Sequence, residues 1–552
     1  MEGTVYDPIF TPKEMGILSR YVSGVESDIF VFKPALAGLV GAVFARYSRA
    51  AGGAKIQLLN EFLDENGELK LEKLDQLIGR VLILYGDDSV GELEYAQLAL
   101  ENISNIATKA VENLRLQSPI EQSSRYAVYD QKDRDGNYRY LRPPEVKEAG
   151  LLEEYERPMN FIFEKYIELM SIMGDFYRRL KPESEAEYAI KPNDPVKYKL
   201  SQLTEDKEIR AWNLTYKTDI KTKACDTVRG LLPAATLTNV GNVANGRTFQ
   251  NMLTQLLSSD LAELRDIGDR AKDALSTVIP KYVERAGVSD YILKVRDDMR
   301  FLSDELIGTG IYGSSGSNPV TLFYAGSYSD FDAMAIAHIL YPYTTAPLSI
   351  LYRKAQRMDI QTRKRIAETY CGHKKDRGNR RNKPGRGLEF GYPIIFDLIG
   401  DYGIYRDLQR HRMLTQQRQL LGPHLGYNIP DDIKEAGFGN VFEECLEKSE
   451  DLYYLLQHHF DSEVAQYGVL FAFNVRWYVG MNHREAFHKL ELRTGPQGHP
   501  SYRKICQEMH RQLLQNDSLF APLMEFVDYE DYQWSRADSE ARQRQKESKL
   551  SD

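Results

Sequence analysis

The sequence predicts a mixed α/β protein in which helix exceeds strand. Apolar residues recur at helical spacing over three stretches, 94–115, 261–275 and 441–459. Short aliphatic runs that predict strands, such as RVLILYG at 80–86, are sparser. Hydrophobic residues make up 42% of the chain and charged residues 27%, which is the composition of a soluble globular protein.

Length and local composition predict how the chain is divided. Because 552 residues exceed one ordinary hydrophobic core, we expect two to four domains. Glycine and serine crowd into residues 308–319, which predicts a linker. We therefore expect one large part over 1–307, a second over 320–534 and a polar tail over 535–552. Within the first part, residues 183–222 are polar and have the composition of an insertion.

Charge and cysteine usage exclude several classes of protein. The net charge of −9 disfavours a general nucleic-acid binder, because phosphates would be repelled on average. The N-terminus MEGTVYDPIF lacks the pattern of a signal peptide, and no apolar run approaches the length of a membrane span. The four cysteines form no C-x-x-C pair, so we expect no metal site, no disulfide framework and a cytoplasmic location.

Two segments share a pattern that indicates an internal duplication. NGRTFQNML begins at Asn245 and NHREAFHKL begins at Asn482. In each segment an arginine follows the asparagine by two positions and a further polar residue follows it by six. The matching pairs are Asn245 and Asn482, Arg247 and Arg484, and Asn251 and His488.

A second pair of segments carries an arginine- and serine-rich signature. The stretch QRHRMLTQQRQ (409–419) contains three adjacent potential cations, which indicate an anion nearby. Overlaid on QSPIEQSSRY (117–126), it resembles the signature of the flavin-dependent thymidylate synthases, an Arg-His-Arg triplet followed by Glu-x-Ser-x-Arg. The second copy has the triplet Arg410-His411-Arg412 but Arg418, Leu420 and Gly422 at the later positions. The first copy has Glu121, Ser123 and Arg125 there but Asn113-Leu114-Arg115 instead of the triplet.

Two further arginines of that family are also divided between the copies. The arginine of the Arg-x-x-Leu-Pro element is present as Arg229 in the first copy and replaced by Gln466 in the second. The arginine of the Leu-x-Leu-Arg element is present as Arg493 in the second copy and replaced by Leu256 in the first. The resemblance covers roughly 40–280 and 330–515. It implies a helix-rich α/β protein made of two tandem copies of this fold, forming a pseudo-dimer.

The losses are complementary, which implies one complete composite site. In the family each nucleotide site lies between subunits, and the two subunits supply different anchors. The resemblance therefore implies a substrate site for dUMP made of Ser123, Arg125, Arg229, Arg410 and Arg493, the last two also being catalytic candidates. The implied reaction is reductive methylation of dUMP to dTMP, with FAD as cofactor, methylenetetrahydrofolate as carbon donor and NADPH as reductant. The family needs no cysteine nucleophile.

The resemblance also implies a set of flavin-binding residues. One of them, Ser89, follows Asp87 and Asp88 where the family has a histidine, which departs from the pattern. By analogy with the family we expect a homodimer containing four copies of the fold. The implied flavin-binding residues are Ser89, Glu121, Arg410, His411, Arg412, Asn245, Arg247, Asn251, Asn482, Arg484 and His488.

Several alternatives remain open at this level. The chain would also suit a degenerate, non-catalytic relative that binds nucleotide or nucleic acid as a regulatory module. His488 reads equally well as a partly buried structural histidine, and His499 as a turn residue. For the basic tract at 373–386 three interpretations are ranked. A solvated loop comes first, the entrance of a site that attracts polyanionic ligands second, and an RNA-binding segment third. The sequence leaves open which pyrimidine nucleotide binds and whether the composite site forms within one chain.

Overall fold

A computed structural model describes most of the chain after residue 89. The described residues are 90–191, 196–308, 310, 318–325, 331–372, 384–517, 521–532 and 534, with isolated positions 12, 27, 29–31, 72 and 76. The RVLILYG stretch, most of the 308–319 linker, the basic tract up to residue 383 and the polar tail lie outside these ranges.

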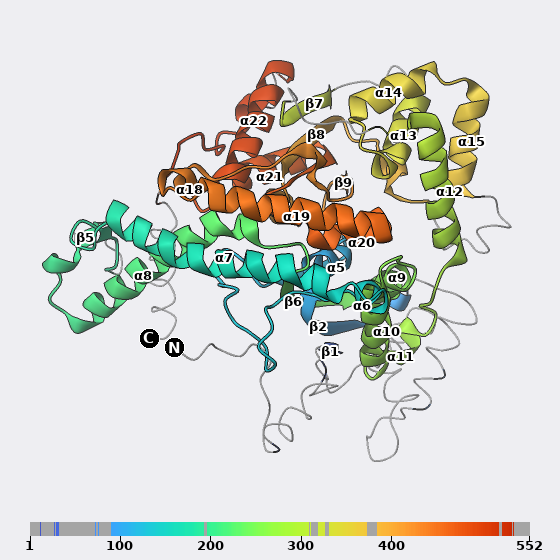
Figure 1. Ribbon diagram of the computed structural model, residues 1–552. Helices are drawn as coiled ribbons and strands as arrows, with labels where there is room; N and C mark the ends of the chain where they lie inside the picture. Colours follow the sequence, from blue (N-terminus) through green and yellow to red (C-terminus); the bar gives the residue numbers. More distant parts are fainter. Residues whose placement is uncertain are drawn as a thin grey trace, which may run out of the picture.

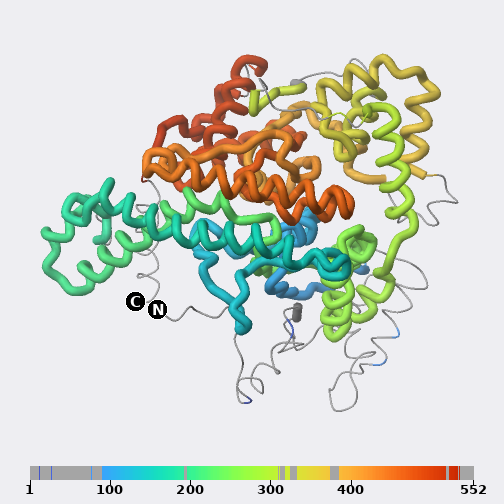
Figure 2. Tube along the Cα trace, viewed as in Figure 1, coloured from blue at the N-terminus to red at the C-terminus, as the bar shows by residue number. Residues whose placement is uncertain are grey.

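Two four-stranded antiparallel sheets, each with helices packed around it, form the described structure (Figures 1 and 2). The first sheet has the order β1-β2-β6-β3 and the second has the order β7-β8-β10-β9. The strands are β1 (Ile29–Val31), β2 (Tyr95–Ser104), β3 (Gln117–Glu121), β6 (Leu237–Asn245), β7 (Val320–Ala325), β8 (Ile394–Asp401), β9 (Thr415–Arg418) and β10 (Asn474–Met481).

The prediction of a single helix over 94–115 was wrong for its first part. Strand β2 occupies Tyr95–Ser104, and only Asn105–Val111 forms helix α5. Buried side chains alternate along β2, as at Ala96, Leu98 and Leu100, and this period of two buries one face of a strand. The other two periodic stretches, 261–275 and 441–459, do form helices, α10 (Ala262–Ser276) and α19 (Gly439–His459).

The helices repeat in the same order around each sheet. In the first half the β2–α5–β3 unit is followed by the long helix α7, the turn η5, strand β6 and helices α9 and α10. In the second half β8–α17–β9 is followed by α19, η9, β10, α21 and α22. Helices α7 and α19 pack against each other between the halves (Figure 1). The bounds are α7 (Leu152–Leu180), α9 (Gly246–Leu257), α17 (Tyr402–Leu408), α21 (His483–Thr494), α22 (Pro500–Asn516), η5 (Arg229–Leu231) and η9 (Gln466–Gly468).

The remaining elements include one more equivalent pair, α6 before α7 and α18 before α19, and several that lie outside the repeated order. Helix α8 packs along α7, and the short β4–β5 hairpin connects the two within the polar 183–222 stretch. Helix α12 leads from the first half toward the second, where α13, α14 and α15 pack on a separate apolar cluster (Figure 1). The bounds are β4 (Glu187–Tyr188), β5 (Tyr198–Lys199), α6 (Pro144–Glu148), α8 (Asp206–Val228), α11 (Pro280–Val283), α12 (Asp290–Ile307), α13 (Phe331–Leu340), α14 (Leu348–Arg357), α15 (Ile360–Cys371), α18 (Asp431–Glu435) and α20 (Ser462–Ala465).

Equivalent backbone positions of the two copies bond to each other. Pro233 and Leu470 pair in an isolated antiparallel bridge, and each stands equally far before the asparagine of its own copy, Asn245 or Asn482. On either side of the bridge, Ala234 N donates to the carbonyl of Val469 at 2.8 Å, and Phe471 N donates to the carbonyl of Leu232 at 2.9 Å. The two copies are therefore related by a pseudo-twofold axis that passes near this bridge.

The triplet positions meet in the same reciprocal way. Arg115 Nε donates to the carbonyl of Leu414 at 3.3 Å, and Arg412 Nη1 donates to the carbonyl of Gln117 at 2.5 Å. These two contacts exchange under the pseudo-twofold, because Arg115 is equivalent to Arg412 and Gln117 to Leu414. One hydrophobic core extends across both copies, so the predicted pseudo-dimer is confirmed. Among the described residues, no helix is both long and apolar enough to cross a bilayer.

Candidate functional site

A cleft of about 1040 Å³ lies between the two copies and contains two of the predicted substrate anchors, Arg125 and Arg229. The first copy contributes these arginines and the end of α8, and the second contributes residues from β8, α17 and the start of α22. We call it the composite cleft. Gly403 of α17 leaves room for Arg229, since a Cβ there would lie 3.4 Å from Arg229 Nη2. Arg125 and Arg229 of the first copy therefore face residues of the second copy within a single chain.

Arg125 forms a two-pronged ion pair. Its Nε and Nη2 atoms donate to the two carboxylate oxygens of Asp226 at 2.8 and 2.9 Å. Burial lowers the pKa of the Arg125 guanidinium, but the Asp226 charge outweighs it and the net pKa is raised. The hydroxyl of Ser123 accepts a hydrogen bond from Arg125 N at 3.3 Å, which places this third anchor directly beside it. Such fork geometry also suits a phosphate.

Arg229 pairs across the copies with Asp407, at 3.0 Å from Nη2 to the carboxylate. Burial raises the pKa of Asp407, but the charges of Arg229, Arg125, His499 and Arg410 lower it well below its usual range. The Asp407 carboxylate thus interacts electrostatically with three of the predicted anchors and with His499 at the start of α22. Any anionic ligand of the composite cleft must therefore compete with Asp407 and Asp226 for the guanidinium groups of Arg229 and Arg125.

Arg410 and Arg493 lie beside the composite cleft rather than among the described residues that line it. Tyr502 links the two sides, because the guanidinium carbons of Arg125 and Arg493 lie 5.9 and 5.8 Å from its ring centroid. Arg410 is exposed and lies in a small hollow between the copies that Asn113 also lines. The five predicted anchors are therefore neighbours, although only two of them face the cleft itself.

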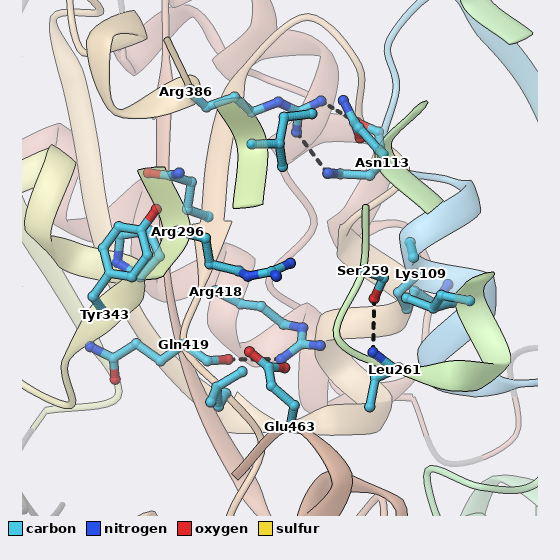
Figure 3. Close-up of a pocket in the computed structure, with 18 of the residues that line it drawn as sticks. Lys109, Asn113, Ser259, Leu261, Arg296, Tyr343, Arg386, Arg418, Gln419 and Glu463 are labelled. Atoms are coloured by element: carbon cyan, nitrogen blue, oxygen red, sulfur yellow. Dashed lines mark hydrogen bonds between the residues drawn. The ribbon is translucent and has the colours of Figure 1, made fainter. Parts of the chain in front are cut away.

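The pseudo-twofold mate of the composite cleft is larger and differently lined. It has a volume of about 2040 Å³, and we call it the mate cleft (Figure 3). Gln466 lines it in place of Arg229, Leu420 in place of Ser123 and Asn113 in place of Arg410. Arg418 projects into it at the position equivalent to Glu121 (Figure 3). Among the described residues that line the mate cleft, three of the predicted anchors are thus replaced by uncharged residues without an equivalent hydroxyl or guanidinium group.

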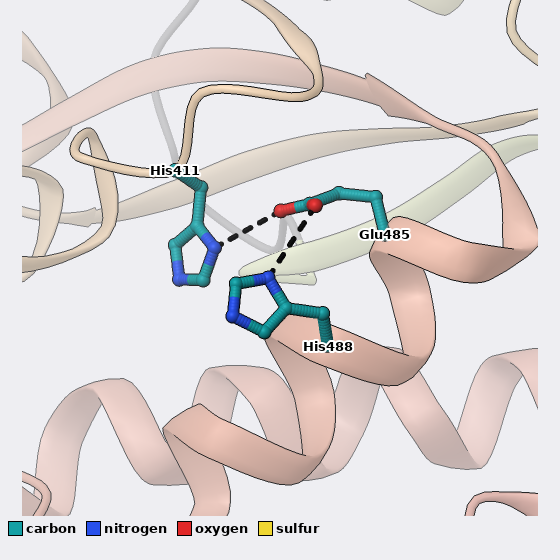
Figure 4. A group of neighbouring side chains, drawn as sticks. All are labelled: His411, Glu485 and His488. Carbon is teal, nitrogen blue, oxygen red and sulfur yellow. Dashed lines mark hydrogen bonds and ion pairs between the residues drawn. The ribbon is translucent and has the colours of Figure 1, made fainter. Parts of the chain in front are cut away.

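Arg493 is the end of a hydrogen-bonded relay in the second copy, whose other members, His411, Glu485 and His488, are drawn in Figure 4. Its Nε donates to His411 Nε2 at 2.8 Å, and His411 Nδ1 lies 3.0 Å from the buried carboxylate of Glu485. His488 Nδ1 lies 3.5 Å from the other oxygen of Glu485. At the equivalent positions the first copy has Leu114, Thr248, Asn251 and Leu256, so the relay belongs to the second copy alone.

The relay also has the composition of a divalent metal site. Atoms of His411, Glu485 and His488 lie within 4.8 Å of one another, and two histidines with one carboxylate are a common ligand set. However, Nε2 of His411 accepts a hydrogen bond from Arg493 Nε, so the ring proton of neutral His411 must sit on Nδ1. That nitrogen then donates to Glu485 and has no lone pair for a metal. The proton count therefore favours a hydrogen-bonded relay.

Several predicted flavin residues have structural partners of their own. Asn245 and Asn482 cap α9 and α21, where their side chains accept from Thr248 N and Glu485 N. Arg247 pairs with Glu92. Asn251 lines the mate cleft rather than the composite cleft, Arg484 is exposed, and Ser89 lies outside the described residues.

Glu121 is buried away from both clefts. Its carboxylate lies 2.8 Å from Lys109 Nζ of its own copy and forms an ion pair with Arg406 of the second copy. Burial raises the pKa of Glu121, but the positive charges of Arg406 and Lys109 lower it below the ordinary value. The observed role of this carboxylate is to hold the two copies together.

Comparison with known sequences decides the family. The profile described as thymidylate synthase complementing protein matches residues 40–281 and 392–517 of the chain. The chain belongs to the thymidylate synthase complementing protein family. The unmatched residues between these segments, 282–391, cover the end of the first part, the linker and the start of the second part, and the split into two segments is consistent with a family fold that occurs twice.

Full-length relatives and solved structures accompany this match. UPF0159 proteins of Chlamydia muridarum and Chlamydia pneumoniae are 35% and 34% identical, each over 97% of this chain and 98% of the relative. A UPF0159 protein of Thermoplasma acidophilum is 28% identical over 91% and 98%. Among solved structures, a flavin-dependent thymidylate synthase of Helicobacter pylori with FAD and dUMP is 16% identical (45% of this chain, 94% of that chain, TM-score 0.23). A UMP/dUMP methylase of Streptomyces cacaoi with 5-Br dUMP is 16% identical (46% and 92%, TM-score 0.28).

Sequence reasoning missed most of the groups that hold the anchors in this family member. Asp226, Asp407 and Glu485 are acidic residues with no distinguishing motif, so only the fold brings them to Arg125, Arg229 and His411. Tyr502 likewise belongs to no motif that the sequence analysis identified. His499, expected as a turn residue, instead caps α22, where its side chain accepts from Ser501 N.

Acid should destabilise this chain through its buried histidines. Burial lowers the pKa of His338 and His411 to about 4 and that of His499 to about 3. The unfolded chain takes up these protons below about pH 6.5, whereas the folded chain does not. The free energy of unfolding should therefore fall between pH 6.5 and pH 4, by up to about 1.4 kcal/mol per pH unit for each histidine. Denaturant unfolding at several pH values measures this slope, and His338→Gln should reduce it; an unchanged slope would contradict the assignment.

Proposed function

We propose that the composite cleft binds dUMP and supports its FAD-dependent reductive methylation to dTMP, with methylenetetrahydrofolate as carbon donor and NADPH as reductant. Family membership and the resemblance in the arginine signature support this reaction. The observation that carries the proposal is that Arg125 of the first copy and Arg493 of the second lie against the same ring, that of Tyr502, within one chain.

In this proposal the first copy holds the nucleotide phosphate. Arg125 and Arg229 offer bidentate donors, and Ser123 offers a hydroxyl. Binding would exchange part of their pairing with Asp226 and Asp407 for pairing with the phosphate. Arg493 and Arg410 would approach the nucleotide from the second copy, with Arg493 oriented by His411. We infer from the same resemblance a cytoplasmic homodimer of fused chains.

The second copy also suits a flavin with its pyrophosphate. Arg410, Arg412 and Arg484 are exposed on this copy, and none of them forms an ion pair with a carboxylate among the described residues. Exposed arginines without carboxylate partners favour a diphosphate group. His411, Asn482 and His488 would complete the site from this copy, and the first copy would contribute Ser89, Asn245 and Arg247, whereas Glu121 is enclosed by Lys109 and Arg406 and Asn251 lines the mate cleft. When bound, the flavin supplies the hydride chemistry; the protein residues bind and orient.

The experiment is complementation of a thymidine-requiring bacterial strain, combined with the absorbance spectrum of the purified protein. The wild-type chain should restore growth without thymidine and show a flavin band. Arg229→Ala and Arg493→Ala should each abolish growth, because a lost charge-assisted bond at a phosphate costs about 1.5–3 kcal/mol and a lost transition-state contact costs more. Arg365→Ala, which removes an exposed arginine paired with Glu305 on α12, is the matched control. Growth that persists in both active-site variants contradicts the proposal.

A second function is favoured by the pairing of Arg125 and Arg229 with internal carboxylates. In addition, the described residues that line the composite cleft include five lysines and arginines but seven aspartates and glutamates. Such a lining weakens the attraction for a dianion. The alternative is a non-catalytic module that binds nucleotide or nucleic acid. A purified protein without a flavin band, together with no rescue of growth, would favour this alternative.

A further inference from the structure

The mate cleft has the opposite charge balance to the composite cleft. Seven lysine and arginine side chains line it against five aspartates and glutamates in the described part of the chain. The excess is therefore cationic, although the chain as a whole has a net charge of −9. A cleft with low-dielectric walls focuses such an excess on its interior. The mate cleft thus attracts anions more strongly than its counterpart.

Arg418 is the central cation of the mate cleft. Its Nη1 atom donates to the carbonyl of Gln419 at 2.8 Å and to Gln466 Oε1 at 3.0 Å. Both acceptors are neutral, and within the described residues no carboxylate lies in ion-pair range of Arg418. The same position in the first copy is Glu121, so this substitution replaced a buried carboxylate with a cation that faces open space.

Arg386 supplies a second cation on the wall next to the first copy. Its Nη1 atom donates to Asn113 Oδ1 at 2.9 Å, and Nη2 donates to the carbonyl of the same residue (Figure 3). Burial and the nearby charge of Arg115 lower the pKa of Arg386, as expected where positive charges are incompletely compensated. Arg386 is also the end of the basic tract at 373–386, so the tract reaches the mate cleft there.

Helix α12, which follows the first copy, adds arginines to the lining of the mate cleft. Arg296 and Arg300 both pair with Asp260, at 2.8 Å in the case of Arg300, and Arg300 also pairs with Glu463 at 2.6 Å. Arg296 Nε is buried and has no hydrogen-bond partner. Asp297 also lies in ion-pair range of both, at 3.7 Å from Arg296 Nε and 3.9 Å from Arg300 Nη1, so three carboxylates compensate these two arginines.

Uncharged lining groups indicate what kind of anion fits. Glutamine and asparagine side chains are abundant, and the buried amide oxygens of Gln409 and Gln416 have no hydrogen-bond partner. Amides recognise the edges of nucleobases, and tyrosine rings such as Tyr343 and Tyr454 offer faces for stacking. The volume of about 2040 Å³ is about twice the upper range of small-ligand pockets, so the cleft has room for more than a mononucleotide.

We propose that the mate cleft binds a nucleoside polyphosphate, with Arg418 and Arg386 on the phosphates and the amide and tyrosine groups on the base. The position of the cleft supports this class, since it is the pseudo-twofold equivalent of the composite cleft. The ligand differs from a monophosphate substrate because the monophosphate anchors are replaced there and the arginines are spread over a wider opening. The site does not depend on catalysis at the composite cleft.

The test is equilibrium binding of a fluorescent ATP analogue, mant-ATP, to the full-length chain, followed by anisotropy at fixed ionic strength. Arg418→Gln and Arg386→Gln should each raise the Kd about tenfold or more, as expected for a lost charge-assisted phosphate contact. Arg229→Gln, in the composite cleft, and Arg365→Gln, on exposed α15, should each change the Kd less than twofold. Unlabelled ATP should displace the probe at lower concentration than inorganic pyrophosphate or a thymidine oligonucleotide.

Each contrary result overturns the proposal in a distinct way. A Kd that Arg418→Gln and Arg386→Gln both leave unchanged excludes the mate cleft, provided the thermal melts of the two variants match that of the wild type. A Kd that rises only in Arg229→Gln places the probe in the composite cleft. Displacement by pyrophosphate as effective as by ATP indicates an unspecific anion site, and tighter displacement by the oligonucleotide indicates a nucleic-acid site. None of these readouts uses thymidylate formation, so failure of the proposed function would be distinguishable.

Discussion

Glu121→Gln should lower the free energy of unfolding by about 3–5 kcal/mol. The glutamate is buried between Lys109 and Arg406, with Nζ of Lys109 at 2.8 Å. Both cations are also buried, and Arg406 lies with its guanidinium carbon 4.4 Å from the ring centroid of Phe471. Removing the carboxylate charge leaves Arg406 without an ion-pair partner among the described residues. Denaturant unfolding of the full chain measures the loss.

The control for this variant is Glu305→Gln, which breaks an exposed ion pair with Arg365. Exposed pairs contribute about 0–1 kcal/mol, so Glu305→Gln should barely shift the transition. The effect of Glu121 should also depend on pH. Its folded pKa is depressed, so its contribution is fully present above the unfolded value near 4.3 and is lost as pH falls below that value. A loss of less than about 1 kcal/mol at pH 7 would be incompatible with a buried pair of this kind.

Glu485→Gln should reduce thymidylate formation about tenfold to a hundredfold if the proposed function holds, mainly through kcat. Glu485 accepts from His411 with one carboxylate oxygen and lies close to His488 with the other. Glutamine has one acceptor oxygen and an amide that donates, so it cannot satisfy both rings. His411 would then lose the tautomer that accepts from Arg493 Nε. We therefore expect Arg493 to lose its fixed orientation, and a misplaced catalytic group costs about a hundredfold.

A positioning role for Glu485 predicts more than a loss of rate. Glu485→Asp should restore part of the activity, and Glu508→Gln, which removes an exposed carboxylate of α22, should leave both kcat and KM unchanged. The ring-nitrogen NMR signals of His411 should report an Nδ1 proton in the wild type and a mixture in Glu485→Gln. Stoichiometric bound metal in the wild type that is lost in Glu485→Gln would instead establish the two histidines and the glutamate as ligands.

The sequence was informative where residues act through a repeated pattern. Helices α10 and α19 were predicted from the spacing of apolar residues. The duplication was predicted from matched positions such as Asn245 and Asn482, which cap equivalent helices in the two copies. Strand β2 was misread because its apolar residues satisfy period two and period 3.6 over the same few positions, and its bulge places Asn102 at φ 56°. Only the sheet pairing decides between the two.

The candidate site was less accessible to sequence reasoning because ion pairing is a long-range property. Arg125 and Arg229 were singled out by motif, yet nothing local shows that Asp226 and Asp407 neutralise them. Glu121 fits the signature as well as any other residue, although its carboxylate is enclosed by Lys109 and Arg406. Whether a polar side chain of the first copy is paired or free to bind a ligand depends on its partners in the second copy, such as Arg406 for Glu121 and Asp407 for Arg229.

The pseudo-twofold contact at Pro233 and Leu470 has a consequence for how such a protein can change. In a homodimer every substitution near the symmetry axis appears twice, so a residue that suits one side is imposed on the other. Covalent fusion removes that constraint, and each side can mutate alone. Glu121 and Arg418 are equivalent positions with opposite charge, an arrangement that separate identical chains could not encode. The reciprocal contacts of Arg115 and Arg412 show the part of the interface where both sides still obey the ancestral symmetry.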